Sequence, residues 1–349
     1  MGRVYGGARS FASTTVATSC QLWGHKLAAC GYDGHLLPPI SEDLLTIAIP
    51  FYKGHAYLRA AIESVLRQTS AEWRLVVCDD GPEVGTTELV ASYADPRIRY
   101  LRNERNLGMA GNWNRCLDVA QTDLVNLLHN DDELLPNYVE VMLGAAREHP
   151  EAAAFFCRAK VIDANGKESF SFVDYVKRYL QPKGKGPLVL EGQSAVEALM
   201  HGDFIMCPTV CYRKSRLPAE RFRAEWRMVL DLDFFTRILL DGGTMVGLPA
   251  VAYAYRRHAE NATAAYTENL LRFEEESRLH DHVAAVARDR GWPSVARVAA
   301  RKRVIKFHLL FRILQDVSRL RLGGAARKGG LLCRLLRPSG NKTPLRGIP

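Results

Sequence analysis

Residues 123–136 read DLVNLLHNDDELLP, an apolar run that ends in adjacent acids. A continuous apolar run is typical of a strand that is covered on both faces of a parallel sheet. Ligands of open α/β sheets bind at the carboxyl ends of such strands. We therefore expect a buried strand that brings Asp131 and Asp132 to the edge of a sheet, where a metal ion or a phosphate group would bind.

The same order of strand, polar loop and helix precedes this stretch. Three earlier apolar runs predict strands, at residues 44–52, 74–78 and 98–101. Between the first two, apolar residues such as Leu58 and Ile62 recur at the spacing of one helix face. Repeated strand and helix units predict an α/β class with a parallel sheet.

The second half of the chain continues the alternation less regularly. We expect a helix at residues 136–148, a short helix that begins at Ser194, and an apolar helix that is entered at Asp231 and Asp233 within residues 225–240. Strands are expected at 153–162, 205–212 and 245–255, and helical structure from residue 264 to about residue 320. Residues 170–192 lack periodicity and predict a long loop.

The composition is that of a globular protein with an uneven distribution of charge. The chain has 349 residues, 47% hydrophobic and 24% charged, with a net charge of +9. From Arg297 onward there are 14 Lys and Arg residues and a single acid, Asp316. No basic motif interleaved with aromatic residues accompanies this charge, so nucleic-acid binding is not expected.

Cysteine usage and the lack of long apolar runs indicate the compartment. None of the eight cysteines forms a CxxC pair, which favours buried thiols in a reducing, cytoplasmic environment. No run of about 18 apolar residues predicts a membrane-spanning helix. Residues 1–43 are rich in Ser and Thr and are expected to form a disordered leader.

Six short motifs carry a more specific signal than any of these patterns. They are IPFY at 49–52, VCDDGP at 77–82, NLG at 106–108, HNDDELLP at 129–136, DLDFFTR at 231–237 and YRRH at 255–258. In order and spacing the chain resembles glycosyltransferase family 2 over residues 44–263. The resemblance implies the GT-A fold, a Rossmann-like and mostly parallel sheet flanked by helices. Residues 264–349, beyond the resemblance, are expected to form a helical, basic C-terminal extension.

The resemblance also implies an activity. It indicates an inverting enzyme that moves a sugar from a UDP- or dTDP-type donor to a glycan or a lipid-linked acceptor. The residues that match the family's nucleotide-sugar-binding motifs are Pro50, Tyr52, Asp79, Asp80, Asn106, Asn130 and Arg257. Arg256 is a further basic residue that could pair with phosphate oxygens.

By the same resemblance, a divalent cation, Mn or Mg, is expected beside the diphosphate. Asp131 matches the final acid of the family's DxD signature, and His129 stands where the first acid is usual. Asp132 and His258 complete the predicted metal site. Hard divalent cations take oxygen ligands, which adjacent carboxylates supply.

Asp231 matches the general base of the family, which takes a proton from the acceptor hydroxyl. Its nearest competitor is Asp233, which would otherwise be an ordinary acid in the first turn of a helix, where the helix dipole favours it.

Two alternatives concern the whole chain and its basic end. The missing first acid of the DxD signature leaves open a catalytically silent, membrane-associated scaffold protein with the same fold. The apolar stripe from Phe307 to Val317 could dock on an anionic membrane surface or pack on the domain, and packing is the favoured alternative for this helix. The basic tail as a whole is expected to be attracted to an anionic membrane surface. The protein would then be cytoplasmic and peripheral on the inner face of the membrane.

Overall fold

The central sheet begins with four parallel strands, β1 to β4. The computed structural model describes residues 44–170, 186–258 and 262–337, and places these strands at Leu45–Phe51, Trp73–Asp79, Ile98–Arg102 and Leu124–Leu127. β1 pairs with β2 on one side and with β4 on the other, and β3 pairs with β2. The connecting helices are α2 (His55–Leu66), α3 (Thr86–Ala91) and α4 (Gly108–Val119). The predicted alternation of strand and helix is confirmed.

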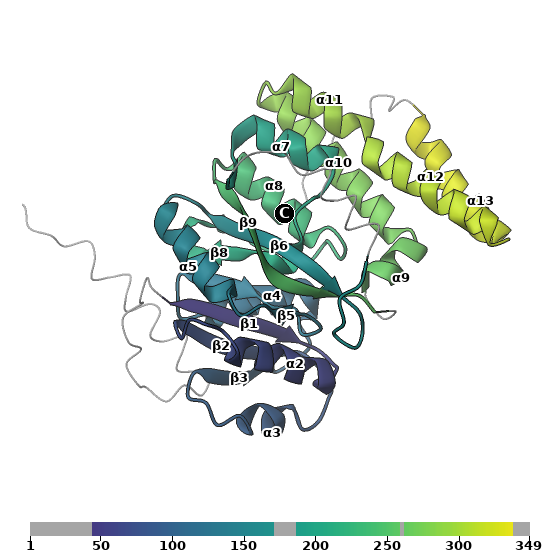
Figure 1. Ribbon diagram of the computed structural model, residues 1–349. Helices are drawn as coiled ribbons and strands as arrows, with labels where there is room; N and C mark the ends of the chain where they lie inside the picture. The colour runs from purple at the N-terminus through teal and green to yellow at the C-terminus, as the bar shows by residue number, and fades with distance from the viewer. Residues whose placement is uncertain (1–43, 171–185, 259–261, 338–349) are drawn as a thin grey trace, which may run out of the picture. The chain divides into compact units, whose positions relative to one another are not determined.

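Beyond β4 the sheet becomes mixed. β8 (Cys211–Arg213) is antiparallel to β4 and to β6 (Ala154–Ile162), whereas β6 runs parallel to β9 (Met245–Arg256). Two short strands, β5 (Glu133–Leu134) and β7 (Leu188–Leu190), are antiparallel to β9. The predicted α/β class is confirmed, with a sheet that is parallel from β1 to β4 and mixed after it (Figure 1).

Three segments differ from the sequence prediction. The strand expected at residues 205–212 is a 3-10 turn at Cys207–Thr209 followed by the short β8, because Pro208 has no N–H for a sheet hydrogen bond. β5 and β7 were not expected, since their stability comes from pairing with β9 and not from a pattern of their own. The expected loop at 170–192 therefore contains β7, and its residues 171–185 lie outside the described part of the chain, as does the predicted leader at 1–43.

Both faces of β1 are buried, which accounts for its continuous apolar sequence. Leu45, Ile47 and Ile49 pack with α2 and α5 (Tyr138–Glu148) on one face. Ala48 faces the opposite core, where α4, α7 (Gly192–His201) and α8 (Leu230–Leu240) contribute. Full burial of one such aliphatic side chain stabilises the fold by about 1.5–3 kcal/mol, so β1 is a major source of stability.

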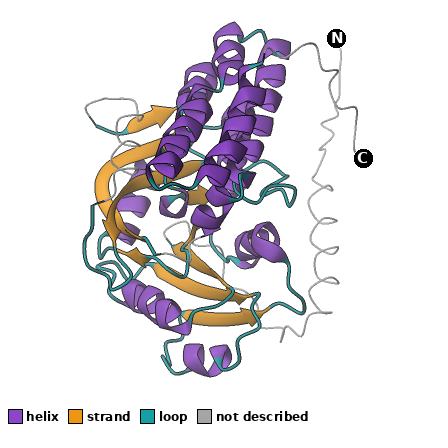
Figure 2. Cartoon of the chain, turned by 90° about the vertical axis from the view of Figure 1, so that its right-hand side faces the viewer, coloured by secondary structure: helices purple, strands orange, loops and turns teal. Residues whose placement is uncertain are grey.

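Five helices follow β9 in the described range 262–337. They are α9 (Ala262–Glu268), α10 (Leu271–Asp289), α11 (Pro293–Arg301), α12 (Arg303–Ser318) and α13 (Leu322–Leu336). α10 and α11 add Leu279, Val283 and Val295 to the core that also contains α7 and α8. α12 and α13 lie side by side and share a smaller cluster with α10 (Figures 1 and 2).

The domain boundary expected at residue 264 stays a prediction. Helical structure continues through α13, beyond the expected end near residue 320. Within the described ranges no helix combines the length and apolar character needed to cross a bilayer.

We predict that Gly81→Ala destabilises the fold. A Cβ atom built on Gly81 would lie 1.7 Å from the carbonyl oxygen of Tyr52, so the backbone after β1 or β2 would have to move. The expected loss in free energy of unfolding is at least about 1–3 kcal/mol, measured by urea denaturation.

Gly144→Ala is the matched control, because Gly144 lies within α5 and a Cβ there meets nothing within 4 Å. Alanine in a helix interior should raise the free energy of unfolding by about 0.5–1 kcal/mol. Equal stabilities of the two variants would contradict the predicted close approach at Gly81.

Candidate functional site

The loops that follow β1, β2 and β4 meet at one edge of the sheet. Pro50 lies in β1, beside Cys78 of β2, and Tyr52 follows the strand with 51% of its side chain exposed. The N–H of Asp80 donates to the carbonyl oxygen of Phe51 at 2.9 Å, which joins the first two loops. This is the edge where the sequence predicted ligand binding.

Asp79 is fully buried at the end of β2. Its carboxylate accepts hydrogen bonds from the N–H of Gly81 at 2.9 Å and from the hydroxyl of Tyr100 at 2.6 Å. Burial, assisted by the Asp79 carboxylate, raises the pKa of Tyr100, so the phenol stays protonated and donates. Asp79 therefore fixes the turn after β2 and its side chain faces the protein.

Asp80 anchors the loop that leads into α4. Its carboxylate accepts hydrogen bonds from the side-chain amide of Asn103 at 2.9 Å and from the N–H groups of Leu107 at 2.7 Å and Gly108 at 3.0 Å. Asn106 is exposed beside them and donates to the carbonyl oxygen of Asp80 at 2.8 Å. Asp80 thus holds the Asn106 loop against the end of β2.

The loop after β4 is tied to β1 and to β9. The side-chain amide of Asn130 donates to the carbonyl oxygen of Lys53 at 3.0 Å. Asp132 is 1% exposed and accepts from the N–H of Arg256 at 2.7 Å and from the hydroxyl of Tyr253 at 3.1 Å. Burial, with the neighbouring Asp131 carboxylate, raises the pKa of Asp132 well above its usual range. Both oxygens of Asp132 therefore serve the contact with β9.

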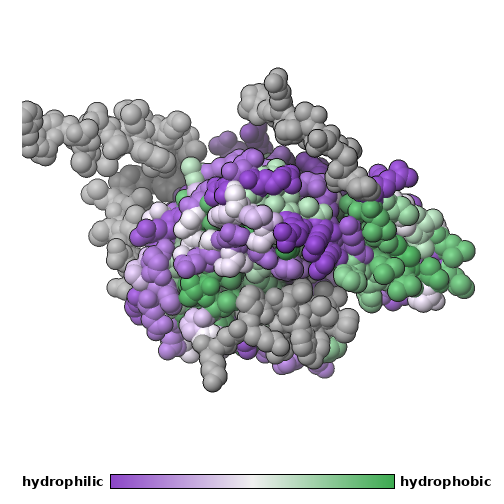
Figure 3. All heavy atoms as spheres, turned by 90° about the horizontal axis from the view of Figure 1, so that it is seen from above, coloured by the Kyte–Doolittle hydropathy of each residue, from purple (hydrophilic) through white to green (hydrophobic). Residues whose placement is uncertain are grey.

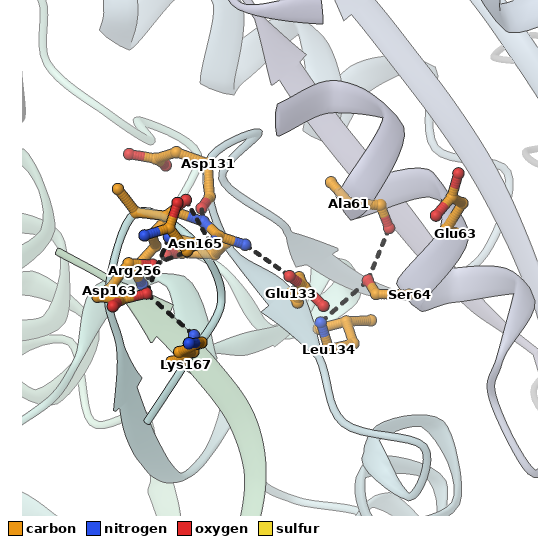
Figure 4. Close-up of polar contacts among 12 residues, drawn as sticks. Ala61, Glu63, Ser64, Asp131, Glu133, Leu134, Asp163, Asn165, Lys167 and Arg256 are labelled. Carbon is orange, nitrogen blue, oxygen red and sulfur yellow. Dashed lines mark hydrogen bonds and ion pairs between the residues drawn. The ribbon is translucent and has the colours of Figure 1, made fainter. Parts of the chain in front are cut away.

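Arg256 completes this contact from the other side. Its guanidinium donates to the carbonyl oxygens of Asp131 at 2.7 Å and Asp163 at 3.0 Å and to the carboxylate of Glu133 at 2.5 Å (Figure 4). The side chain is 3% exposed. The expectation that Arg256 pairs with phosphate is thus replaced by a structural role, because its donors are already bound to protein oxygens.

Asp131 and His258 come together across 127 residues of sequence. The Nε2 atom of His258 lies 2.9 Å from a carboxylate oxygen of Asp131, and both side chains are half-buried. The His258 ring also packs on Tyr57, with centroids 5.2 Å apart. Arg257 lies next to this pair, half-buried, with its guanidinium 5.4 Å from the Tyr255 ring centre.

His129 occupies the same corner. Its Nε2 atom is buried without a hydrogen-bond partner in the described structure, and its ring packs on Trp113 with centroids 5.2 Å apart. Burial lowers the pKa of His129, so the imidazole is neutral at neutral pH and has a lone pair to donate.

These groups fit a divalent cation. One potential ligand atom from each of His129, Asp131 and Asp132 lies within 4.8 Å of the others. Carboxylate oxygen and neutral imidazole nitrogen are suitable donors for Mn²⁺ and related ions. His129, which stands where the first acid of the DxD signature is usual, is therefore part of the cluster. Asp132 belongs to the cluster too, but both of its oxygens also accept hydrogen bonds from β9.

Asp231 and Asp233 lie in the first turn of α8 with different surroundings. Asp233 is 1% exposed and forms an ion pair with Arg237 at 2.9 Å, with Arg223 a further 3.6 Å neighbour. Asp231 is half-buried and accepts from the N–H of Leu232 at 2.9 Å. The contacts of Asp233 match the structural alternative weighed for it, and the role of Asp231 as a base stays a prediction.

Glu275 of α10 holds the turn that enters α8, a role that the sequence did not suggest. It is 3% exposed, and its carboxylate accepts from the N–H groups of Arg227 at 3.0 Å and Met228 at 2.8 Å. The only sign of this role in the sequence is that Glu275 lies between the apolar residues Phe273 and Leu279 of one expected helix. Asp231 is therefore positioned by a residue from the C-terminal helices.

Comparison with known proteins finds one family profile and several relatives that match part of the chain. The sequence profile described as Glycosyl transferase family 2 matches residues 46–195, a little under half of the chain. A relative in Mycobacterium tuberculosis, Uncharacterized protein MT1568, is 30% identical over 207 residues, which cover 57% of this chain and 63% of that protein. The Escherichia coli UDP-Glc:alpha-D-GlcNAc-diphosphoundecaprenol beta-1,3-glucosyltransferase WfgD is 37% identical over 104 residues, 30% of this chain and 41% of that one. The chain thus spans less than two thirds of either relative.

A solved structure of similar fold covers more of the chain. S. aureus TarS 1-349, crystallised in complex with UDP-GlcNAc, superposes with a TM-score of 0.58 at 16% identity and covers 84% of this chain and 82% of that one. At this identity the likeness concerns the fold alone, and it supports the GT-A arrangement of sheet and helices.

We predict that Glu275→Ala loosens the turn before α8. Loss of a buried acceptor leaves the backbone N–H groups of Arg227, Met228 and Val229 without this carboxylate, which should lower the free energy of unfolding by about 1–3 kcal/mol. Amide hydrogen exchange at Arg227 and Met228 should become faster by a larger factor than that of β1, because the core strand exchanges only through global unfolding. Glu274→Ala is the control, because Glu274 is exposed on the same helix turn. Equal exchange in both variants would refute the assignment.

Proposed function

We propose that the protein is a family 2 glycosyltransferase, as the profile match over residues 46–195 supports, and that it transfers a sugar from a nucleotide diphosphate sugar to an acceptor hydroxyl with inversion. The observation that carries the proposal is the convergence of His129, Asp131 and His258 at the carboxyl edge of the sheet. This edge is where open α/β sheets bind their ligands.

The donor is proposed to be of the UDP or dTDP type. The TarS structure of similar fold was obtained with UDP-GlcNAc, which supports this choice. In the proposal the base and ribose lie against Pro50 and Tyr52, between the loops that Asp79 and Asp80 hold. Asn106, Asn130 and Arg257 would border the rest of the nucleotide sugar.

A divalent cation, Mn or Mg, is proposed beside the diphosphate, held by Asp131 with His129 and Asp132. His258, bonded to Asp131 at 2.9 Å, would orient that carboxylate or add a ligand. Such a cation supplies positive charge that stabilises the leaving nucleotide diphosphate.

Asp231 is proposed as the general base. The acceptor oxygen forms a bond to the anomeric carbon while the bond from that carbon to the phosphate oxygen breaks, and the hydroxyl proton passes to the Asp231 carboxylate. A position in the first turn of α8 favours the ionised carboxylate through the helix dipole. A single displacement of this kind inverts the anomeric centre and needs no enzymic nucleophile.

The acceptor is proposed to be a glycan or a lipid-linked saccharide of cell-surface polysaccharide synthesis. The name of the relative WfgD, which describes transfer to a diphosphoundecaprenol-linked sugar, supports this class. For such an acceptor the protein would be cytoplasmic and work at the inner face of the membrane. The second candidate is a silent scaffold, favoured by His129 at the position of the first DxD acid.

A screen of UDP- and dTDP-sugars for nucleotide release in the presence of Mn²⁺ tests the proposal. An enzyme should release UDP or dTDP from at least one donor and bind the free nucleotide in a calorimeter. If the protein releases no nucleotide from any donor and also does not bind the free nucleotide, the scaffold is favoured.

With the donor found in this way, we predict that Asp231→Asn lowers the transfer rate by about 10²–10⁴-fold, because the amide cannot accept the proton. Binding of UDP or dTDP by calorimetry should stay the same. Asp233→Asn is the comparison: loss of its ion pair with Arg237 should lower thermal stability first. A fully active Asp231→Asn enzyme would exclude Asp231 as the base.

We predict that Asp131→Ala weakens Mn²⁺ binding, measured by calorimetry without donor, by at least about 10–100-fold, since even outer ligands contribute that much. His129→Ala should weaken it too, and His129→Asp should restore it. Asp163→Asn, a turn acid outside the cluster, should leave it unchanged. Wild-type turnover at its full rate in excess chelator would contradict metal dependence.

A further inference from the structure

The exposed side of α12 is apolar, the reverse of an ordinary surface helix. Its large exposed side chains are Phe307 at 70%, Leu310 at 44%, Phe311 at 47%, Leu314 at 61% and Val317 at 47%. They recur every three or four residues and therefore form one continuous stripe. We define these five residues as the apolar face.

The side of α12 that packs on the protein consists of other residues. Ile305 and Leu309 are fully buried with Phe273 of α10 and Leu331 of α13. The expectation that the stripe from Phe307 to Val317 packs on the domain is therefore wrong. The opposite side of α12, with Ile305 and Leu309, packs on the protein, so the apolar face points outward.

The apolar character continues beyond α12. Leu320, 84% exposed, lies in the connection to α13, and Leu322, 67% exposed, is the first residue of α13. Figure 3 shows apolar side chains gathered at the end of the molecule where Figure 1 places α12 and α13. Exposed apolar patches of this kind mark interaction surfaces.

The exposed charged residues of α12 and of the segment that joins it to α13 are all basic. Arg303, Arg319 and Arg321 are exposed at the two ends of α12. The single acid of α12 and α13, Asp316, is buried and pairs with Lys328 at 2.6 Å. The exposed surface of the helix pair therefore presents apolar and cationic groups together.

We propose that the apolar face of α12 docks on the surface of an anionic lipid bilayer. Phenylalanine and leucine would enter the headgroup and acyl boundary, while the arginines at both ends bind lipid phosphates. A 16-residue helix is about 24 Å long, which suits a helix that lies in the plane of the interface. The proposal rests on this surface alone and does not depend on glycosyl transfer.

A second copy of the chain is a poorer occupant. A two-fold interface brings the same surface of both subunits together, so the arginines of one copy would meet those of the other. No exposed acid of α12 or α13 could compensate them. An anionic bilayer supplies both the apolar phase and the negative charge.

The docking helix is firmly attached to the rest of the protein. Arg312 pairs with Glu268 of α9 at 3.1 Å, and Phe273 of α10 packs on its buried side. α10 also carries Glu275, which holds the turn before Asp231. Docking would therefore bring the membrane to α12, and α10 connects α12 to the turn before Asp231.

Vesicle sedimentation of the full chain, without any nucleotide sugar, tests the proposal. The protein should sediment with vesicles of phosphatidylcholine mixed with phosphatidylglycerol and much less with phosphatidylcholine alone, and added NaCl should release it. A variant with Phe311→Ser and Leu314→Ser should bind at least about tenfold more weakly. A variant with Arg319→Gln and Arg321→Gln should bind more weakly and depend less on salt.

Val84→Ser is the matched control, because Val84 is 89% exposed but lies far from α12 in the sequence, before α3. It should bind vesicles like the wild type, and all variants should melt at the same temperature. Equal vesicle binding by the Phe311 and Leu314 variant would overturn the proposal. The proposal would also be overturned if neither protein bound vesicles and sedimentation velocity showed a dimer for the wild type that the Phe311 and Leu314 variant no longer forms.

Discussion

The buried contact between Asp132 and the end of β9 is the constraint on which the candidate site depends. Asp132 accepts the N–H of Arg256, and the Arg256 side chain returns to the carbonyl oxygen of Asp131. Leaving a buried carboxylate without a hydrogen-bond partner costs about 1–3 kcal/mol for each lost bond, and more when the group is charged. Separation of Asp132 from Arg256 is therefore strongly unfavourable. The loop after β4 is therefore fixed to β9, and Asp131 meets His258, two residues beyond Arg256.

Acids at the sheet edge divide into those that hold the loops and those that face outward. Asp79, Asp80 and Asp132 are buried, and their oxygens accept hydrogen bonds from the protein. Tyr52 and Asn106 are exposed, and Asp131 and Asp231 are half-buried. Preorganised loops of this kind reduce the entropy lost on binding a ligand, because the ligand meets side chains that are already in place.

The C-terminal helices contribute both to the position of the candidate base and to the proposed membrane-docking surface. Through Glu275, α10 fixes the turn before the helix that carries Asp231, and through Phe273 it supports α12. The same helix thus contacts the neighbourhood of the candidate base and the support of the proposed membrane surface. For a lipid-linked acceptor, this arrangement would keep the transfer site at a fixed position relative to the lipid headgroups.

Local patterns in the sequence determined the class of the fold and the motifs of the site. The apolar runs of β1 and β4 predicted buried parallel strands because burial on both faces removes the alternation of polar and apolar residues. The roles of single polar residues were decided only by the tertiary structure. Whether Arg256 binds a phosphate or a carbonyl oxygen, and whether the stripe of α12 is covered, depend on groups that are distant in the chain. Their proximity arises from strand pairing and helix packing, which no local pattern encodes.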